Sequence, residues 1–155
     1  ILKIPEFRVQ EHVATVPGTD GQKMSKSYGN TVNIFGEQKK QLKTIKKIVT
    51  QNVAMEDPKE YEGCNVYNMA KLFLNENECL ELQARYKKGG EGHGHFKLYL
   101  ADVIWEHFKE QRAKREYYVN NQDEVREILN MGANKAREIA IPMIEKIRTA
   151  TGIRY

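Results

Sequence analysis

The spacing of apolar residues separates an irregular opening stretch from a helical remainder. Up to about residue 35, β-branched stretches such as residues 7–9 and 12–16 predict short strands or extended arms, which Pro5 and Pro17 interrupt. From residue 37 onward, apolar residues recur every three or four positions, which is the repeat of an amphipathic helix. The pattern therefore predicts a mainly α chain, in which a short extended or β arm precedes a helical domain.

Breaks in this repeat divide the helical part into five or six segments. Residues 37–50 form the first, with an apolar stripe made of Leu42, Ile45, Ile48 and Val49. Pro58 precedes the second, whose apolar side contains Val66, Met69, Ala70, Phe73 and Leu74. A third helix near residues 76–88 should stop at Gly89 and Gly90, because glycine readily takes the left-handed conformation that ends helices.

Three more helices are predicted toward the end of the chain. The longest should run over about residues 94–118, where the repeat continues without a breaker. A short helix over residues 122–130 should follow, capped by Asn121 and facing inward through Val125, Ile128 and Leu129. The last helix, over residues 133–150, contains Pro142, which should kink it or split it. Short connections between these segments predict an α-helical bundle.

Composition narrows the class of protein without indicating a function. The chain has 155 residues, of which 40% are hydrophobic and 30% are charged, and its mean hydropathy is -0.69. These values are typical of a polar globular chain, and no apolar run approaches the roughly 18 residues of a membrane span. Cys64 and Cys79 are too few for a four-thiolate metal cluster, and a disulfide between them is possible by count but disfavoured in a reducing compartment.

Basic residues are concentrated on one predicted helix face. The formal net charge is +4, and residues 37–50 contain five lysines against a single acid, Glu37. Such a face can bind phosphate backbones through counterion release, although a single cluster is more often a solvated helix surface. Four of these lysines fall largely opposite the apolar stripe: Lys39, Lys43, Lys46 and Lys47. The further basic clusters are Arg112, Lys114 and Arg115, and then Arg85, Lys87 and Lys88.

The segment with the clearest chemistry is the pentapeptide of residues 23–27, which lies between Gly21 and Gly29. Two ammonium groups on a glycine-hinged loop can stabilise the negative charge that develops during phosphoryl or nucleotidyl transfer. The predicted roles are charge donors for Lys23 and Lys26, completion of an anion site for Ser25 and Ser27, and apolar anchoring for Met24. From composition alone, the default alternative is two ordinary lysines in a surface turn.

This pentapeptide, Lys-Met-Ser-Lys-Ser, resembles the KMSKS signature of class I aminoacyl-tRNA synthetases, which join an amino acid to ATP and then to tRNA. The likeness continues into bacterial-type tryptophanyl-tRNA synthetases over the flanking residues 17–22 and 28–31. It includes residues 47–50, 56–59, 64–67 and 71–73, and residues 135–137 and 149–152 are similar to that family's last helix. The resemblance therefore covers nearly the whole chain.

The resemblance implies two parts with different roles. Residues 1–35 would be the trailing edge of a Rossmann-like catalytic domain that carries the KMSKS loop, and residues 36–155 an α-helical anticodon-binding domain. Lys23 and Lys26 would stabilise the pyrophosphate of ATP, which Mg²⁺ accompanies in the full-length enzyme. All of residues 23–27 would bind ATP, with backbone near residues 13–16 and Met24 approaching the adenine. The candidate contacts to tRNA(Trp) are Lys39, Lys43, Lys46, Lys47, Arg112, Lys114 and Arg115.

The same resemblance implies parts that this sequence does not contain. In that family a HIGH-type ATP motif and the tryptophan pocket lie on the N-terminal side of the loop. The four histidines here form no such motif, and the first residue is Ile1, so we expect an excised C-terminal part that is inactive alone. The full-length enzyme is expected to be a cytoplasmic homodimer without membrane association, which binds tryptophan only through the missing N-terminal domain.

Other functions stay open at this point. A tyrosyl-tRNA synthetase or another class I synthetase has a related architecture, and a stand-alone RNA-binding helical module would use the basic faces without ATP. In the glycine-rich segment 89–95, His95 stands where a phosphate-binding loop requires lysine, so a connector is favoured. His93 and His95 could offer two metal nitrogens, but no cluster of carboxylates or thiolates accompanies them, and no protein-bound metal is predicted.

Overall fold

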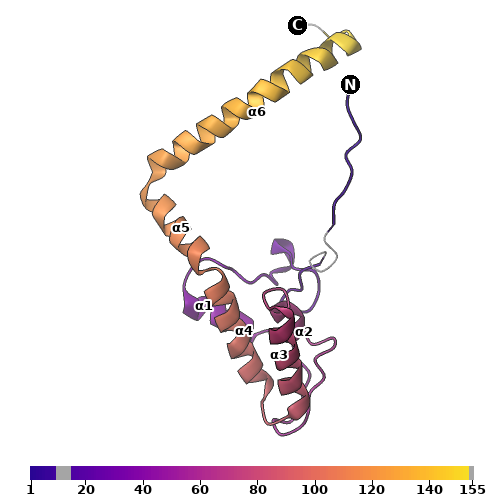
Figure 1. Ribbon diagram of the computed structural model, residues 1–155, viewed down its shortest axis with the longest axis vertical. Coiled ribbons are helices and arrows are strands. Elements are labelled where there is room, and N and C mark those ends of the chain that lie inside the picture. The colour runs from indigo at the N-terminus through magenta and orange to yellow at the C-terminus, as the bar shows by residue number, and fades with distance from the viewer. Residues whose placement is uncertain (10–14, 154–155) are drawn as a thin grey trace. The chain divides into compact units, whose positions relative to one another are not determined.

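The computed structural model of the chain describes residues 1–9 and 15–153 (Figure 1). Within those residues it contains a short 3₁₀ turn, η2 (Lys26–Tyr28), and a series of α-helices. The helices are α1 (Gln38–Lys46), α2 (Asn65–Ala70), α3 (Glu76–Lys88), α4 (His93–His107), α5 (Lys109–Asn120) and α6 (Gln122–Thr151). The prediction of a mainly α chain is confirmed.

The opening stretch contains little regular pairing. Residues 1–9 are extended, and the one β-type pairing in the described part of the chain is an isolated antiparallel bridge between Pro17 and Lys23. The strand predicted over residues 12–16 rests largely on residues 10–14, which lie outside the described residues.

Contacts group the chain into two compact units, and each is described by itself. The first is Val9–Arg112, which contains η2 and helices α1 to α4. The second joins Ile1–Arg8 with Ala113–Tyr155, and it contains most of α5 and all of α6. The domain boundary predicted at residues 35 and 36 falls inside the first unit.

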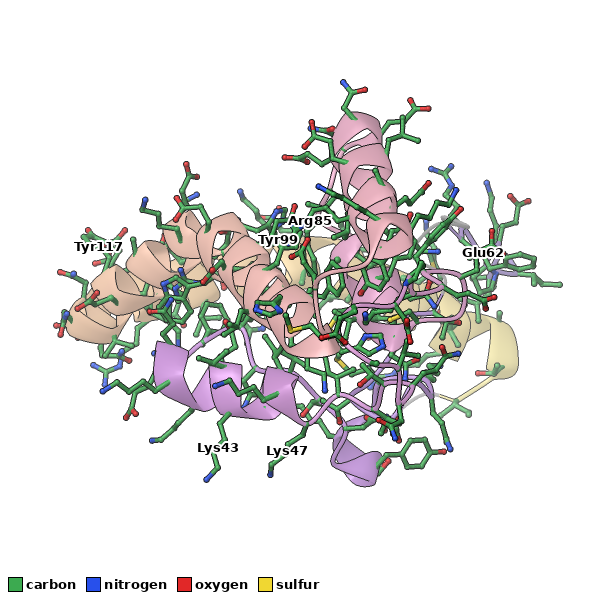
Figure 2. The ribbon with its side chains drawn as sticks, turned by 90° about the horizontal axis from the view of Figure 1, so that it is seen from below. Lys43, Lys47, Glu62, Arg85, Tyr99 and Tyr117 are labelled. Carbon is green, nitrogen blue, oxygen red and sulfur yellow. The ribbon has the colours of Figure 1, made fainter. Side chains whose placement is uncertain are left out.

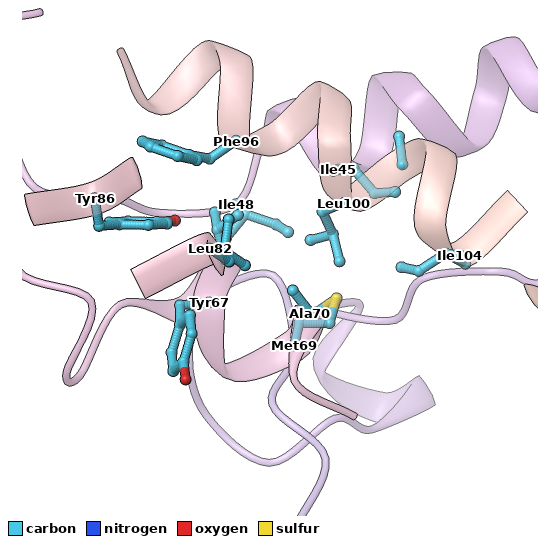
Figure 3. Close-up of a cluster of buried hydrophobic side chains, with 12 residues drawn as sticks. Ile45, Ile48, Tyr67, Met69, Ala70, Leu82, Tyr86, Phe96, Leu100 and Ile104 are labelled. Carbon is cyan, nitrogen blue, oxygen red and sulfur yellow. The ribbon is translucent and has the colours of Figure 1, made fainter. Parts of the chain in front are cut away.

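Helices α1, α2, α3 and α4 enclose the core of the first unit (Figure 3). Helix α4 packs against both α1 and α2, and Tyr86 of α3 stacks on Phe96 of α4 with ring centroids 3.8 Å apart and an interplanar angle of 17°. Burial of this apolar surface at about 25 cal/mol per Å² is the main term that stabilises the unit. The buried hydrophobic cluster comprises Ile45, Ile48, Val66, Tyr67, Met69, Ala70, Leu82, Tyr86, Phe96, Leu100, Ala101 and Ile104.

Helix α1 is shorter than the segment predicted for it. Ile45 and Ile48 are buried as expected, but the Val49 side chain is 60% exposed, so its place in the apolar stripe was wrong. The backbone explains the difference, because the N–H of Ile48 donates to the carbonyl of Ile45 at 3.0 Å in a tighter turn. The N–H of Val49 then donates to the carbonyl of Thr19 at 2.9 Å, outside the helix.

Helix α3 spans the range that its pattern predicts and has strong signals at both ends. At its start the Asn75 side chain accepts from the N–H of Glu78, and the Glu78 carboxylate accepts from the N–H of Asn75. At its end Gly89 has a φ of 72°, and a Cβ there would strike the carbonyl of Glu56. Gly89 is therefore required both by its conformation and by the close approach of residues 56–58.

The single helix predicted over residues 94–118 is instead two helices, α4 and α5. The break is at Phe108, whose φ and ψ are -97° and 17°. Its ring packs edge-on against Phe73 with centroids 5.7 Å apart, a contact to a residue that follows α2. The apolar repeat ends at Phe108, and residues 109–112 are polar, but no glycine or proline stands at the break. Tertiary packing rather than a local breaker therefore sets this boundary.

Conversely, the two helices predicted over residues 122–150 are one continuous helix, α6. Neither Gly132 nor Pro142 interrupts it, because the hydrogen bond lost at one proline is a small part of those made along 30 residues. Asn121 stands at the N-cap position, but its side chain donates to the carbonyl of Tyr117 instead of capping α6. The inward placement of Ile128 and Leu129 was wrong, since these side chains are 43% and 65% exposed.

One lysine of the first unit is a structural residue. Lys59 is only 3% exposed, and its Nζ donates to the carbonyls of Ala54, Met55 and Asp57 at 2.8, 3.1 and 2.8 Å. The ammonium thus satisfies three backbone acceptors of the loop between α1 and α2, which offsets the cost of burying its charge. Among the described residues, none of the helices combines the length and apolar character needed to cross a bilayer.

Candidate functional site

Residues 17–30, here called the lysine loop, fold back on themselves as a tight turn. The N–H of Gly18 donates to the Gln22 carbonyl at 2.7 Å, and the N–H of Met24 donates to the Val16 carbonyl at 2.8 Å. Gly21 closes the turn with a φ of +83°, which side chains other than glycine rarely adopt. The backbone on both sides of Lys23 is therefore fixed by hydrogen bonds.

The buried side chain of Asn30 ties this loop together from inside. Its Oδ1 accepts from the N–H of Ser25 at 2.7 Å, and its Nδ2 donates to the Lys23 carbonyl at 3.1 Å. The same Nδ2 donates to Oδ1 of Asp20 at 2.8 Å, and this bond is the largest cause of the lowered pKa of Asp20. Asn30 is 2% exposed, and Gly18 packs so closely against it that no Cβ would fit there. Asn30 is thus the main internal support of the lysine loop.

The two lysines of the loop point their charge to solvent. Lys23 and Lys26 are exposed, and in the described ranges 1–9 and 15–153 neither ammonium has a hydrogen-bond or ion-pair partner. Ser25 and Ser27 share a hydrogen bond of 2.8 Å between their hydroxyls at the start of η2. The loop therefore presents two uncommitted positive charges on a backbone that is held in place.

Met24 faces the opposite way, toward the helical core. It is half-buried against the hydrophobic cluster and borders a cavity of about 310 Å³. The other side chains that line this cavity are apolar. They come from both sides of the lysine loop, from the end of α2 and the residues after it, and from the end of α4, and they include Val16, Val32, Phe73, Ile104 and Phe108. The lysine loop is thus anchored on one side and open to solvent on the other.

A second set of contacts connects the lysine loop to α2. Asn65 is the first residue of α2, and its Nδ2 donates to the Val49 carbonyl at 3.0 Å. The Val49 N–H in turn donates to the Thr19 carbonyl at 2.9 Å, and the Thr19 N–H donates to the Asn30 carbonyl at 2.9 Å. Sequence reasoning missed both asparagines. Asn30 follows Gly29 directly, where a side chain that can donate and accept is a usual partner for irregular backbone, whereas Asn65 has no local signal.

The predicted basic face of α1 is exposed in the structure. Lys39, Lys43, Lys46 and Lys47 all reach solvent, and Figure 2 shows Lys43 and Lys47 extending from the same side of the helix. Lys40, beside them, forms an exposed ion pair with Glu37 at 3.0 Å. The lysine side chains are thus placed where a polyanion could reach them.

The other basic clusters are partly used inside the fold. The Arg112 guanidinium stacks on Trp105, and Arg85 forms a two-point pair with Glu91 at 2.9 and 2.6 Å while lying 5.0 Å from the ring centroid of Tyr99 (Figure 2). This pair raises the pKa of Arg85 and lowers the pKa of Glu91. Lys114 and Arg115 are exposed and belong to the second unit. The predicted cluster of Arg112, Lys114 and Arg115 is therefore divided between the two units.

The histidines near the start of α4 have separate roles. The Nδ1 of His95 accepts from the Gly92 N–H at 3.1 Å. Both ring nitrogens of His93 are buried, and neither has a hydrogen-bond partner among the residues that the structure describes. Burial, followed by the charges of Lys59 and Lys97, lowers the pKa of His93. Cys64 and Cys79 are half-buried free thiols, and no group of three or more potential metal ligands occurs in the part of the chain that the structure describes.

Comparison with known proteins shows which family the chain is similar to. The family described as "tRNA synthetases class I (W and Y)" matches residues 1–109. The tryptophan–tRNA ligase of Campylobacter jejuni (strain RM1221) is 50% identical over 153 residues, which is 99% of this chain and 48% of that protein. The tryptophan–tRNA ligase of Rhodopirellula baltica is 43% identical over 151 residues, 97% of this chain and 47% of that protein.

A solved structure agrees with these relatives. The crystal structure of tryptophanyl-tRNA synthetase from Campylobacter jejuni complexed with ADP and tryptophan matches with a TM-score of 0.84 and 51% identity. That match covers 94% of this chain and 46% of the crystallised chain. The chain spans about half the length of the curated relatives it matches.

Proposed function

Because the chain belongs to the class I tRNA synthetases of the W and Y family, we propose that it forms part of a tryptophan–tRNA ligase. In this proposal residues 1–35 end the catalytic domain with the lysine loop, and residues 36–155 form the anticodon-binding helical domain. The relatives reported above are tryptophan–tRNA ligases, which supports this function over a tyrosine enzyme or a stand-alone RNA-binding module.

The single observation that carries the catalytic proposal is the state of Lys23 and Lys26. Both ammonium groups are exposed and uncommitted within the described residues, while Asn30 and Met24 hold the backbone that bears them. A carboxylate of the amino acid attacks the α-phosphate of ATP, an aminoacyl adenylate forms and pyrophosphate leaves. Charge accumulates on the leaving pyrophosphate, where two positioned ammonium groups stabilise the transition state.

The nucleotide in this proposal is ATP, which enters as its Mg²⁺ complex and is a substrate. In this proposal the hydroxyls of Ser25 and Ser27, which neighbour Lys26 in the sequence and bond to each other at 2.8 Å, also bind its phosphates. The exposed lysines of α1 would bind the phosphate backbone of tRNA(Trp). We further propose that the full-length enzyme is a cytoplasmic homodimer and that its tryptophan pocket lies outside this chain. The support for both proposals is the resemblance to tryptophan–tRNA ligases.

The test is a Lys26→Ala variant of the full-length ligase in a single-turnover assay of adenylate formation. We expect the rate to fall by about 100-fold to 1,000-fold, the usual effect of removing one preorganised donor. Lys71→Ala is the matched control, since Lys71 is an exposed lysine at the end of α2 and outside the loop, and it should retain the full rate. A rate for Lys26→Ala close to that of the unmodified enzyme would overturn the assignment.

A second measurement concerns the chain by itself. None of its four histidines belongs to a HIGH-type motif, so the purified chain should show no exchange between ATP and pyrophosphate. Turnover by the purified chain would contradict this expectation.

A further inference from the structure

We propose that Asn65 is a positioning residue for the lysine loop, and that it acts on Gly21 and, through Val49, on Thr19. This inference rests on the proposed function of the loop. It extends that function to a residue of α2 that touches none of the reacting groups. The argument starts from two contacts at the base of the loop.

The first contact is between Asn65 and Gly21. A Cβ built on Gly21 would lie 2.5 Å from Oδ1 and 2.7 Å from Nδ2 of Asn65, so the amide lies directly against the glycine backbone. The φ of Gly21 is +83°, a conformation that already favours glycine. Gly21 is thus restricted twice, by its own backbone and by the side chain that packs on it.

The second contact runs through the peptide groups of Val49. Asn65 Nδ2 donates to the Val49 carbonyl at 3.0 Å, and the Val49 N–H donates to the Thr19 carbonyl at 2.9 Å. The Val49 side chain is 60% exposed, so its backbone rather than its side chain fixes its place in the fold. Asn65 therefore holds the turn at two points, Thr19 and Gly21.

Asn65 itself is firmly placed. It is followed in α2 by Val66 and Met69, both 2% exposed, and α2 packs against α4. Its side chain does not cap α2, because the N-cap position belongs to Cys64. The amide is thus free to serve the loop, while the helix that carries it is anchored in the core.

These contacts, at Thr19 and Gly21, lie four and two residues before Lys23, so they fix the backbone from which the loop's charged side chains extend. A backbone that turns at Gly21 moves Lys23 and Lys26 together, and Asn65 limits that movement. Small errors in the position of catalytic groups cost much of their effect on rate. Loss of the Asn65 amide should therefore lower kcat while ATP binding in the ground state, and so KM for ATP, changes little.

The experiment uses Asn65→Ala and Asn65→Asp in the full-length ligase, with Asn68→Ala in the same helix as the control. Asn65→Asp keeps the side-chain shape but replaces the donor to the Val49 carbonyl by an oxygen. We expect both variants at position 65 to lower kcat for adenylate formation by about tenfold or more, with KM for ATP changed less than about twofold. Asn68→Ala should match the unmodified enzyme.

A second readout does not depend on activity. Hydrogen exchange at the amides of Thr19 and Met24 should become faster in both Asn65 variants, while exchange in the core helix α4 stays the same. Gly21→Ala should disturb the loop by collision with Asn65. Adding Asn65→Ala should recover part of the lost protection, because it removes the three side-chain atoms nearest to the new Cβ.

The outcomes separate this inference from the proposed function. If Lys26→Ala slows the reaction but Asn65→Ala and Asn65→Asp change neither kcat nor loop exchange, the positioning role is wrong and the catalytic role stands. If Asn65→Ala does not fold, Asn65→Asp decides by the same two measurements. If the Asn65 variants lower kcat and also lose exchange protection throughout α4, the residue has a merely structural role, and the inference is overturned.

Discussion

The guanidinium carbon of Arg112 lies 3.6 Å from the centroid of the Trp105 ring, and the same side chain donates a hydrogen bond to the Trp105 carbonyl. Together the stacking and the hydrogen bond fix the end of α4 against the start of α5. They also occupy a residue that its sequence context had suggested for RNA binding. The role of Arg112 in RNA binding stays a prediction, and the structure offers a way to separate the two roles.

Arg112→Ala should lower the free energy of unfolding by about 1 to 2 kcal/mol, from the lost stacking and hydrogen bond. Urea denaturation monitored by tryptophan fluorescence would measure this, since Trp105 is the only tryptophan. Lys114→Ala, two residues later and exposed, should change stability by less than about 0.5 kcal/mol. A neutral result for Arg112→Ala would mean that the stacked geometry contributes no net stability.

The exposed lysines of α1 lead to a prediction about salt. Replacing both Lys43 and Lys47 by alanine should weaken tRNA binding. It should also reduce the slope of log affinity against log salt by about 1.4 to 1.8, because two phosphate contacts are lost. Filter binding or fluorescence anisotropy over 50 to about 200 mM salt is suited to this range. The Lys71→Ala control should keep the original slope, and an unchanged slope in the double variant would remove α1 from the interface.

Asn30 allows a test of the loop's internal support. Asn30→Ala removes the bonds to Ser25 and Lys23 and should cost about 2 kcal/mol of folding stability, with faster exchange of the Ser25 amide. Asn30→Asp keeps an acceptor for Ser25 but places a second carboxylate beside Asp20, which now receives a hydrogen bond from Asn30. This variant should therefore be less destabilised at pH 3 than at pH 7, within the range where carboxylates of about pKa 4 become protonated. Equal destabilisation at both pH values would contradict the described geometry.

The buried ring of His93 predicts how stability changes with pH. Burial lowers its pKa from the ordinary value of 6.5, so below that value the unfolded chain binds a proton more readily than the folded chain. His93 therefore contributes stability above pH 6.5 that is lost as pH falls through the lower folded pKa. The positive charges of Lys59 and Lys97 lower the pKa of His93 further, because they disfavour a protonated ring.

The measurement for His93 is denaturant unfolding between pH 7.5 and about pH 5, the interval in which an ordinary histidine titrates. His93→Gln should flatten the fall in stability over this interval, because glutamine does not titrate. His107→Gln serves as the control. In this variant the part of the fall in stability that His93 contributes should be unchanged. A slope that persists fully in His93→Gln would assign the pH dependence to other groups.

How far the sequence predicts this fold depends on whether a feature is local. Helix α3 was predicted over its full range because its apolar repeat and its terminal glycine lie within the helix or next to it. The break at Phe108 was missed because its cause is Phe73, 35 positions earlier in the chain. The continuity of α6 through Pro142 was missed for a related reason, since a breaker weakens one turn of a helix whose other turns favour it.

The candidate site shows the same division. Lys23 and Lys26 could be singled out because the whole pentapeptide 23–27 and its glycine neighbours, which resemble a family signature, lie in one short segment. Asn30 and Asn65 could not, because an asparagine gains such a role only from the partners that folding brings to it. The chemical roles of Lys23 and Lys26 stay a prediction, whereas the two asparagines that support the loop could not be predicted from the sequence.

Lys59 gives a different view of the chain's charge. Its ammonium draws three carbonyl oxygens into one small shell, much as a bound cation would, and it is closed off from solvent. A polyanion in solution therefore cannot contact this ammonium, whereas it can contact the exposed lysines of α1. The formal excess of basic over acidic residues is thus a poor measure of the attraction between this chain and a polyanion. That attraction depends on the positive side chains that stay exposed and are not bonded within the fold.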